Sequence, residues 1–373
     1  MITIKEVKTK KDIKAFVKFP FKLYKSSKYW VPPIISQEIK QFDTSENPVF
    51  NSAEATLFLA YKNNEIVGRV AALINWLEVE EQGIKKMRFG WFDFIDDIEV
   101  SQTLLNKVEE IGKLNNLTYT EGPVGFSNLD KVGVMYEGFD TLSTMVSWYN
   151  YPYYVKHYEA AGYTIEKAYT ESMFSVPEVD PEMFLKASKV IQSRYGVKPL
   201  NFKKTKDVLP YVDGMFDLFN TTYASLSSFV AVTDAQKAYF KEKFVSFINP
   251  EYIKFVLSKD DEPIAFAIVM PGFAEALQKM NGKLFPFGFR HLLHAKKHSK
   301  EAIFYLIGIL PEYQNKGIHA VIFEEYRKIF YEKGIERCVR TPELDDNIAI
   351  KQIWKHFNSI PLRKRRTYRK DFL

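Results

Sequence analysis

The residues from Tyr305 to Ala320, Y-L-I-G-I-L-P-E-Y-Q-N-K-G-I-H-A, are the part of the chain best suited to bind an anionic group. An apolar run ends at Leu310, and a short loop leads into a helix-forming segment. The first amides of a helix have no backbone partners and lie at the positive end of its dipole, so they bind phosphate. Gly317 lets the backbone approach a ligand closely, and Lys316 adds positive charge. We therefore expect a phosphate-binding loop.

This loop resembles the Gln/Arg-x-x-Gly-x-Gly/Ala loop of the GNAT (GCN5-related N-acetyltransferase) superfamily, which binds the pyrophosphate of coenzyme A. Gln314 and Gly317 match its first two positions, whereas His319 stands where Gly or Ala is usual and Ala320 follows one residue late. The resemblance implies acetyl-CoA or another acyl-CoA as cofactor. It implies these contact residues: Ile309, Leu310, Gln314, Asn315, Lys316, Gly317, Ile318, His319, Ala320 and Asn347. The alternative is a tight strand-to-helix connection without a ligand.

The resemblance extends over roughly residues 195–373. Residues 303–310 resemble the splayed fourth strand of the family, which hydrogen-bonds the pantetheine arm. Trp354 occupies the position where many members carry a general-acid tyrosine. An indole cannot protonate the departing thiolate, so a different acid, or none, is expected. Glu312 and Glu343 are both candidates for the catalytic base, and the sequence alone does not decide between them.

The first half of the chain resembles the same fold but lacks the loop. Its expected strand at 89–95 runs into Asp93, Asp96 and Asp97. Carboxylates at the start of the following helix interact with its dipole themselves and would repel a pyrophosphate. We therefore expect no CoA binding in this half.

Tyr158, four residues before Gly162-Tyr163, resembles the tyrosine of the Tyr-x-x-x-Gly-Phe ending that the second half has lost. It is the third catalytic candidate, and the alternative is a core tyrosine that packs a helix on the sheet. The glycine-rich stretch 122–140 is too long without regular structure to be a plain connection. This stretch and the Tyr-Asn that follows it resemble a signature of bacterial tandem GNAT-like proteins. We expect four substrate-binding residues here: Ser127, Asn128, Tyr149 and Asn150.

Hydrophobic periodicity predicts the elements that must position these residues. In the first half we expect a helix from Lys10, strands at 56–61, 66–75 and 89–95, and a helix at 100–115. In the second half we expect strands at 198–202, 252–258, 263–269, 303–310 and 337–340, and helices at 208–223, 233–247, 319–332 and 347–356, before a polar and aromatic tail.

The order of elements therefore appears twice, with a linker at 176–181. We expect an α/β (α+β) protein of two tandem GNAT-like domains, each a mixed, mostly antiparallel sheet flanked by helices. The boundaries are 1–175 for a degenerate domain without phosphate loop and 182–373 for a domain with the CoA pyrophosphate loop. A length of 373 residues agrees with two domains.

Composition narrows the class of protein. The net charge of +6 suits an anionic ligand but falls short of the dense basic stripe of a DNA-binding protein, so no DNA partner is expected. Cys338 is the single cysteine, so no intramolecular disulfide can form. Together with the lack of a secretory signal or a long apolar run, this predicts a soluble, cytoplasmic protein.

Residues 274–300 form an insertion in which Phe285-Pro-Phe287 precedes a basic, histidine-containing run. Peripheral contact with an anionic membrane through 285–300, a lid over an acyl chain, and a helical flap packed on the sheet with a solvated basic face are the alternatives. His291 and His294 have no third ligand at zinc-like spacing, so no metal site is expected. The charged run at 363–366 is expected on the surface.

Three functions remain open. The first is an acyl-CoA-dependent N- or O-acyltransferase with a small-molecule or peptide amine acceptor. The second is an enzyme similar to the aminoacyl-tRNA-dependent peptidyl transferases of cell-wall synthesis. The third is a non-catalytic protein that binds acyl-CoA or lipid.

Overall fold

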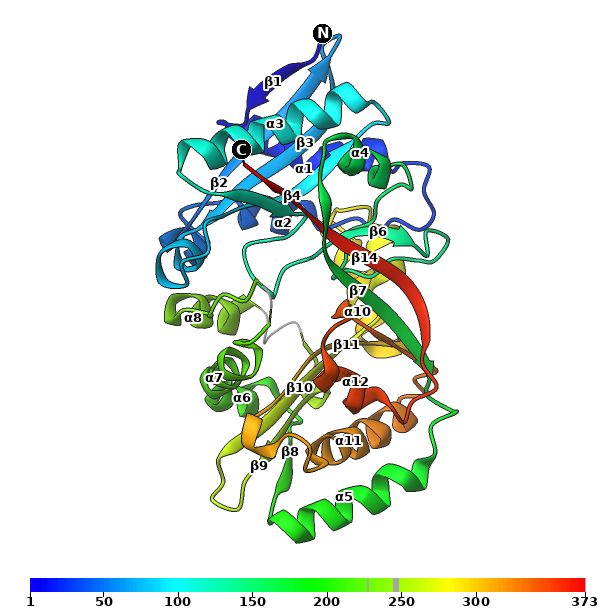
Figure 1. Cartoon of the computed structure of the whole chain (residues 1–373). Coiled ribbons are helices and arrows are strands. Elements are labelled where there is room, and N and C mark those ends of the chain that lie inside the picture. The colour runs from blue at the N-terminus through cyan, green and yellow to red at the C-terminus, as the bar shows by residue number, and fades with distance from the viewer. Residues whose placement is uncertain (227, 244–247, 373) are drawn as a thin grey trace. The chain divides into compact units, whose positions relative to one another are not determined.

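The computed structural model describes residues 1–226, 228–243 and 248–372 (Figure 1). The chain forms two compact units. The first contains Met1–Thr170, Phe273–Leu292 and Leu362–Leu373, and the second contains Glu171–Gly272 and Leu293–Pro361. The first unit thus takes two segments from the C-terminal half of the sequence.

The first unit is built on a mixed sheet with the strand order β1-β2-β3-β4-β5-β14-β7, and β6 pairs with β14. The strands are β1 (Thr3–Glu6), β2 (Ala53–Lys62), β3 (Glu65–Asn75), β4 (Lys86–Phe94), β5 (Tyr119–Gly122), β6 (Val134–Glu137), the first part of β7 (Thr164–Ser175) and most of β14 (Ile360–Asp371). The helices are α1 (Lys10–Leu23), α2 (Ile35–Gln41), α3 (Ile98–Leu114), α4 (Tyr154–Ala160) and α9 (Ala274–Met280), with short turns η1 (Pro48–Asn51) and η2 (Leu77–Glu81).

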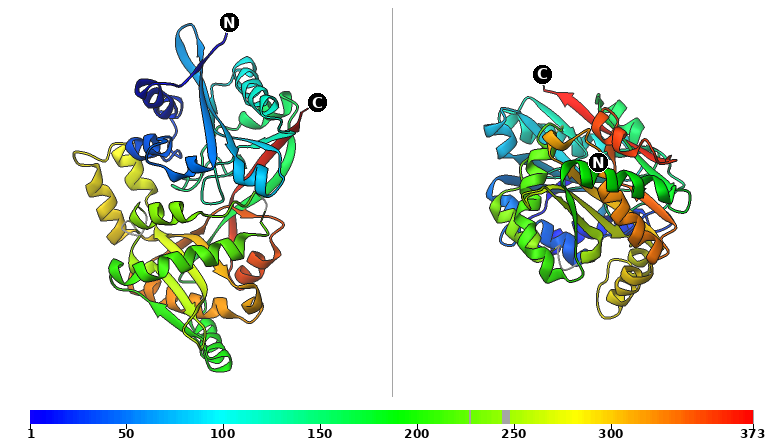
Figure 2. Two further views of the ribbon diagram at one scale, coloured as in Figure 1. Left: turned by 90° about the vertical axis from the view of Figure 1, so that its left-hand side faces the viewer. Right: turned by 90° about the horizontal axis from the view of Figure 1, so that it is seen from below.

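Local sequence fixes several of these elements. Asn63 and Asn64 both have positive φ, which the two-residue turn of the β2–β3 hairpin requires. The side chain of Thr9 caps α1, and that of Asp97 caps α3. Figure 2 shows α1 and α3 on opposite faces of β2 and β3, so the unit has an apolar core on each side of its sheet.

The second unit has the strand order β7-β12-β11-β10-β9-β8, with the short β13 also paired to β7. Its strands are the last part of β7, β8 (Lys198–Asn201), β9 (Ile253–Leu257), β10 (Pro263–Pro271), β11 (Glu301–Ile309), β12 (Arg337–Arg340) and β13 (Glu343–Leu344). Its helices are α5 (Pro181–Tyr195), α6 (Thr205–Val208), α7 (Val212–Tyr223), α8 (Asp234–Lys243), α11 (Ile318–Glu332) and α12 (Ile348–Trp354), with short turns η3 (Leu209–Tyr211), η4 (Pro250–Tyr252) and η5 (Pro311–Tyr313).

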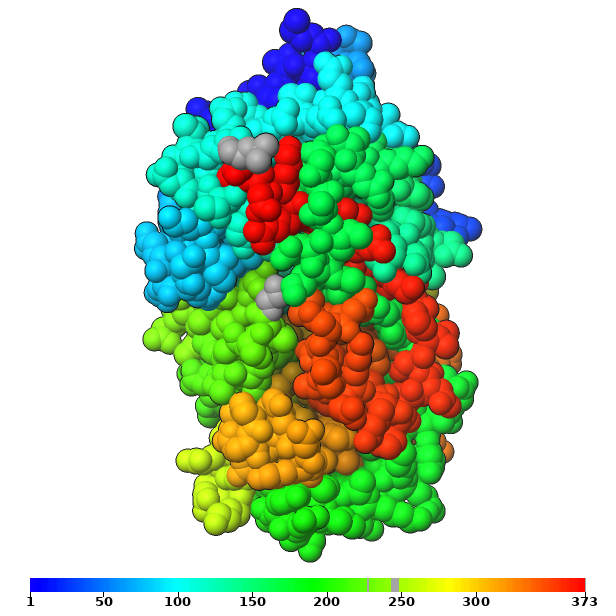
Figure 3. Space-filling model, in the orientation of Figure 1, coloured from blue at the N-terminus to red at the C-terminus, as the bar shows by residue number. Residues whose placement is uncertain are grey.

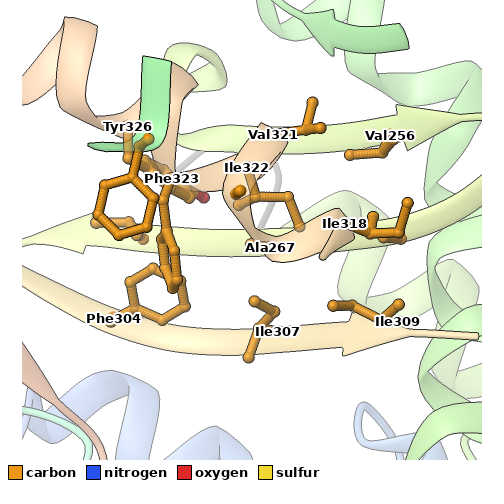
Figure 4. Close-up of a cluster of buried hydrophobic side chains, with 14 of the residues drawn as sticks. Val256, Ala267, Phe304, Ile307, Ile309, Ile318, Val321, Ile322, Phe323 and Tyr326 are labelled. Carbon is orange, nitrogen blue, oxygen red and sulfur yellow. The ribbon is translucent and has the colours of Figure 1, made fainter. Parts of the chain in front are cut away.

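The core of the second unit lies between α11 and the central strands. Figure 4 shows apolar side chains of α11, spaced three and four residues apart, against those of β9, β10 and β11. The labelled residues are Val256, Ala267, Phe304, Ile307, Ile309, Ile318, Val321, Ile322, Phe323 and Tyr326. This packing fixes the start of α11 next to the end of β11.

The insertion is helical and consists of α9 and α10 (Gly288–His298). It is held to the first unit by polar contacts: the Gln278 side-chain amide donates to the carbonyls of Lys28 and Trp30, at 2.9 Å each. The backbone N–H of Ile35 donates to the Gly282 carbonyl. These contacts are with the segment that joins α1 to α2.

Most predicted elements lie within a few residues of the observed ones, and the differences have local causes. The helix expected at 208–223 is interrupted, since Pro210 cannot donate to a continuous helix and η3 separates α6 from α7. Residues 244–247 of the helix expected at 233–247 lie outside the described residues.

The expectation that the charges at 363–366 lie on the surface is wrong for two of them. The segment is strand β14, in which alternate side chains point to opposite faces. Arg363 and Arg365 lie on one face and are almost fully buried, whereas Lys364 and Arg366 on the other face are half-buried. The guanidinium groups of Arg363 and Arg365 donate to the backbone carbonyls of Leu142 and Gly133.

The last strand is expected to stabilise the first unit through Tyr368. Its ring stacks on that of Tyr158 with centroids 4.5 Å apart, and both side chains are buried. Tyr368→Ala should lower the free energy of unfolding by about 3–5 kcal/mol, the usual cost of removing a buried aromatic ring. Urea denaturation measures this change in the free energy of unfolding.

Lys364→Ala on the same strand is the control, because it removes only a surface ion pair with Glu137 and should cost less than about 1 kcal/mol. Equal losses in the two variants would contradict the role of the stacked ring.

Candidate functional site

The site in the second unit begins where two parallel strands separate. β11 pairs with β12 from Glu301↔Arg337 to Phe304↔Arg340, where β12 ends. β11 continues to Ile309 with β10 as its strand neighbour on the other side. Residues 305–309 therefore have a strand partner on one side only, and we call their other side the open edge of β11. An unpaired strand edge can bind an extended ligand through its backbone.

The loop that follows β11 has the geometry of an anion site. Asn315 and Gly317 have positive φ, and α11 starts directly after Gly317. No side chain of the described residues caps α11, and its first turn contains no acid. The Lys316 ammonium lies 4.9 Å from the centroid of the Tyr313 ring. Several loop residues are exposed, and this region is orange in Figure 3. The helix dipole is thus available to an anion.

Two contacts hold this loop in place. The Gln314 side-chain amide donates to the carbonyl of Ile309 at 3.1 Å, which ties the loop to the end of β11. At Gly317 an added Cβ would lie 3.0 Å from Cδ1 of Ile191 on α5, and the positive φ also disfavours other residues. Both predicted motif residues therefore have a structural reason for their type.

His319 and Asn347 have more specific surroundings than the sequence suggested. Burial and the nearby charges of His356 and Lys355 together lower the pKa of His319 to about 4, so the imidazole is neutral at pH 7. The Asn347 side chain caps α12 by accepting from the N–H of Ile350 at 3.1 Å. Asn347 thus has a structural role at the start of α12, whatever its contribution to a cofactor site.

A buried carboxylate lies just beyond the end of β12. Glu343 forms a 2.9 Å ion pair with Arg340, whose guanidinium lies over the Trp354 ring. Burial raises the pKa of Glu343 to about 7, although the Arg340 charge and the Trp354 indole both lower it. The indole N–H itself makes no hydrogen bond of ordinary length within the described part of the chain. A carboxylate with this pKa can accept and release a proton near neutral pH.

This cluster is connected to the open edge of β11 through Thr341. The Thr341 hydroxyl donates to the Tyr305 carbonyl at 3.2 Å, and its N–H donates to the carbonyl of Phe304. Glu312, the other base candidate, is an exposed residue of η5. Of the two candidates, Glu343 is the one that the structure places next to buried charged and aromatic groups beside the open edge.

The first unit contains the same divergence of strands, but its edge is occupied. β4 pairs in parallel with β5 from Lys86↔Tyr119 to Arg88↔Glu121 and then continues to Phe94 with β3 as its strand neighbour on the other side. At Phe94 the backbone N–H donates to the Tyr154 hydroxyl, and the backbone carbonyl accepts from the Tyr153 hydroxyl. Tyrosine side chains of α4 and the residue before it therefore take the backbone groups that an extended ligand would need.

The helix that follows β4 is also occupied at its start. Asp97 caps α3 by accepting from the N–H of Glu99, and it forms a 2.6 Å ion pair with Lys62. The neighbouring Asp96 contacts the His157 ring at 2.9 Å. These carboxylates interact with the helix dipole in place of a phosphate, which supports the expectation that CoA does not bind in this unit.

Three residues that the sequence singled out, Tyr149, Asn150 and Tyr158, line one small hollow of about 20 Å³ in the first unit. The Tyr158 hydroxyl is buried without a hydrogen bond in the described residues, and burial raises its pKa. Asn150 pairs with both backbone groups of Met135, at 2.7 and 2.9 Å. The lining of the hollow is largely aromatic.

Ser127 and Asn128 do not line this hollow and lie in the loop after β5. The Ser127 N–H donates to the Asp130 carboxylate at 3.0 Å. The four predicted substrate-binding residues are thus divided between two places in the first unit. The catalytic and cofactor-binding candidates, apart from Tyr158, all lie in the second unit.

Sequence reasoning missed Tyr223 and Arg340. Tyr223 ends α7, and its hydroxyl donates to the Ile307 carbonyl on the open edge at 3.1 Å. It belongs to no motif, and only the packing of α7 on the sheet brings it there. In the part of the chain that is described, no helix is long and apolar enough to cross a membrane, and no three or more His, Cys, Asp or Glu side chains gather as metal ligands.

No model of a known protein family matches the chain. It is similar to Protein YghO of Escherichia coli (strain K12), with 26% identity over 371 residues that cover 97% of this chain and 93% of the relative. It is also similar to the bacterial ceramide synthase of Caulobacter vibrioides (strain NA1000 / CB15N), with 24% identity over 84% of this chain and 82% of that protein.

Solved structures match over the whole length. A tandem GNAT protein from the clavulanic acid biosynthesis pathway superposes with a TM-score of 0.56 at 8% identity, covering 100% of this chain and 98% of the other. A GCN5-related N-acetyltransferase from Sphaerobacter thermophilus gives a TM-score of 0.54 at 9% identity, covering 99% and 95%. At these identities the likeness concerns the fold. The expectation from Gln314 and Gly317 is confirmed at that level: the chain is a mixed α/β protein with the tandem GNAT fold.

Proposed function

We propose that the protein transfers the acyl group of an acyl-CoA to an amine and that the second unit binds the acyl-CoA. The arrangement that supports this proposal is a strand with an open edge, followed by a loop suited to an anion and then by a helix without a side-chain cap, all in that unit. The first unit has the same strands, but tyrosine side chains occupy its edge and carboxylates occupy its helix start.

The residues of the second unit fit the chemical parts of an acyl-CoA. The amides at the start of α11 and the Lys316 ammonium suit the pyrophosphate. The open edge of β11 suits the amide-containing pantetheine arm through the backbone N–H groups of Ile307 and Ile309, since the carbonyls of both residues already accept from the side chains of Tyr223 and Gln314. His319 is neutral at pH 7 and therefore offers a hydrogen bond rather than a charge to the phosphates.

Glu343 is proposed as the base. Its pKa of about 7 lets a large fraction ionise at neutral pH, and it lies in the cluster that Thr341 connects to the open edge. The amine nitrogen forms a bond to the thioester carbonyl carbon and gives its proton to the Glu343 carboxylate. Glu312 is exposed, and no contact in the described structure ties it to this edge.

The acceptor class is proposed from the relative that is named a bacterial ceramide synthase. Ceramide is the amide of a fatty acid with a long-chain amino alcohol. We propose such amino alcohols as the first acceptors to test, together with polar amines and peptide amines as the alternative.

Gly317→Trp should abolish CoA binding measured by isothermal titration calorimetry. The indole would fill the space in front of the α11 amides, and losing charge-assisted hydrogen bonds worth about 1.5–3 kcal/mol weakens binding at least about tenfold. Gly334→Ala, at the other end of α11, is the matched control: it strains a positive φ as well but is expected to leave CoA affinity unchanged. Absence of CoA binding by the wild type at high-micromolar concentration, together with an undiminished melting temperature of Gly317→Trp, would contradict the proposal.

Turnover distinguishes the remaining alternatives. An acyl-CoA that binds without release of CoA thiol across the amine panel would indicate the non-catalytic binding protein. Binding of tRNA that weakens steeply with added salt would indicate the aminoacyl-tRNA-dependent enzyme. Acylated amine and free CoA in equal amounts are the result expected from the proposed function.

The pH dependence of kcat/KM should follow the ionisation of Glu343. Because the base is needed in its ionised form, kcat/KM should rise with pH through about 7. Arg340→Met removes a cation that lowers this pKa, so the rise should move to higher pH. Arg337→Met on the same strand removes a pairing with Glu301 and should leave the profile in place. A profile that is the same in Arg340→Met and the wild type would rule out Glu343 as the base.

We also propose that the insertion contacts an anionic membrane surface. Residues 276–300 contain six Lys or Arg and no acid, and Phe285 and Phe287 are 73% and 63% exposed. The exposed Arg290, His294 and Lys297 recur three and four residues apart along α10, and the exposed Phe287 directly precedes the helix. Aromatic rings beside a basic helical face suit the interface of an anionic bilayer.

Sedimentation with lipid vesicles tests this contact. The protein should bind phosphatidylcholine vesicles that contain phosphatidylglycerol, less so at high salt, and should not bind pure phosphatidylcholine. The double variant Phe285→Ser, Phe287→Ser should lose most of the binding. Tyr331→Ser, which removes an exposed aromatic ring of α11, should retain it. Equal sedimentation of the double variant and the wild type would contradict the proposed membrane contact of the insertion.

A further inference from the structure

We propose that Tyr223 is the catalytic acid of the second unit and protonates the departing CoA sulfur. The assignment rests on the proposed function. Trp354, at the position of the family tyrosine, has only an indole N–H to offer and is buried. A proton donor must therefore come from another element of this unit.

Tyr223 lies at the open edge of β11 although it comes from a distant helix. Its hydroxyl donates to the Ile307 carbonyl at 3.1 Å, in the middle of the segment that has a strand partner on one side only. Tyr223 as a whole residue is half-buried. A ligand that extends along this edge from the Gln314 loop passes this hydroxyl.

Gly308 allows α7 to come this close. A Cβ at Gly308 would lie 2.6 Å from the Thr222 hydroxyl oxygen of α7 and 2.5 Å from the ring of Phe266 on β10. Both distances are shorter than side chains tolerate, so a larger residue at position 308 would displace Thr222 or Phe266. Gly308 is therefore a positioning residue, since it fixes the distance between α7 and the strand that Tyr223 contacts.

The surroundings keep the Tyr223 hydroxyl protonated. Burial raises its pKa above the ordinary value, and the negative charge of Glu343 raises it further, whereas the hydrogen bond to Ile307 opposes this. The Tyr223 hydroxyl contacts the edge at Ile307, and Glu343 lies two residues after Thr341, whose hydroxyl contacts the same edge at Tyr305.

Together, Tyr223 and Glu343 account for every proton that moves in the acyl transfer. The C–N bond forms as Glu343 takes the amine proton, and the C–S bond breaks with its electron pair going to sulfur. The sulfur takes the Tyr223 proton and becomes the CoA thiol. The proton held by Glu343 then returns to the Tyr223 phenolate, directly or through water, and both residues regain their starting states.

Tyr223→Phe tests the assignment, because it keeps the ring and removes the hydroxyl. We expect kcat with an acyl-CoA to fall by about 100-fold, within the usual range for loss of a general acid, while KM for the acyl-CoA stays within about twofold. The acyl thioester of 4-nitrothiophenol has a leaving group that needs no protonation. With it the variant and the wild type should differ by less than about threefold, because the acid is no longer needed.

Tyr326→Phe is the matched control. The hydroxyl of Tyr326, a buried residue of α11, also donates to a backbone carbonyl, that of Tyr252 at 2.9 Å. The Tyr326→Phe variant should keep kcat within about threefold with both thioesters, since losing a single neutral hydrogen bond there affects stability rather than proton transfer.

The outcomes separate this assignment from the function on which it rests. An active wild type with an unimpaired Tyr223→Phe variant, or a variant impaired equally with both thioesters, overturns the acid role and leaves the acyltransferase in place. A wild type that binds CoA but transfers no acyl group contradicts the proposed function and with it this assignment.

Discussion

The parallel pairing of β11 with β12 ends at Phe304 and Arg340, and the candidate site depends on that ending. Had β12 continued, its backbone would have occupied the edge of β11 up to Ile309. Because it stops, the chain turns into the short strand β13, which pairs with β7 and places Glu343 beside Arg340. The same interruption thus creates an edge for a ligand and a carboxylate with a pKa near 7.

The two units show that strand geometry alone does not make a binding site. Both contain a parallel pair that ends early, but in the first unit Tyr153 and Tyr154 satisfy the backbone of Phe94. In the second unit the carbonyls of Ile307 and Ile309 also accept from side chains, those of Tyr223 and Gln314, so the clearer difference is at the start of the following helix. Asp97 caps α3, whereas no side chain of the described residues caps α11. The difference between the units therefore lies in side chains that compete with the ligand.

Features encoded by neighbouring residues could be predicted from the sequence. The loop at Gln314 and Gly317, the Asn63-Asn64 turn and the Asp97 cap all depend on local chemistry, and each is found in the structure. The predicted order of elements likewise led to the tandem fold. Periodicity in a single strand or helix is enough for this, because it reports which face is buried.

Features that depend on contacts between distant segments could not be predicted. Arg363 and Arg365 belong to a run of four basic residues that is typical of a surface, and only the fold brings them into a buried position next to the carbonyls of Leu142 and Gly133. The choice of Glu343 over Glu312 needed the contact with Arg340, and Tyr223 needed the approach of α7 to Gly308. None of these contacts leaves a pattern in neighbouring residues.

The positions of the tyrosines illustrate what a motif can and cannot transfer. Tyr158 stands at the family-like position of the first half, yet its ring is stacked on Tyr368 and its hydroxyl is buried. Tyr223 stands at no recognised position, yet its hydroxyl contacts the backbone of an open strand edge. A proton donor acts where its hydroxyl can reach the reacting atoms, so access decides its role. The second unit can therefore lose the motif tyrosine at Trp354 and still supply a phenol to the same strand from another helix.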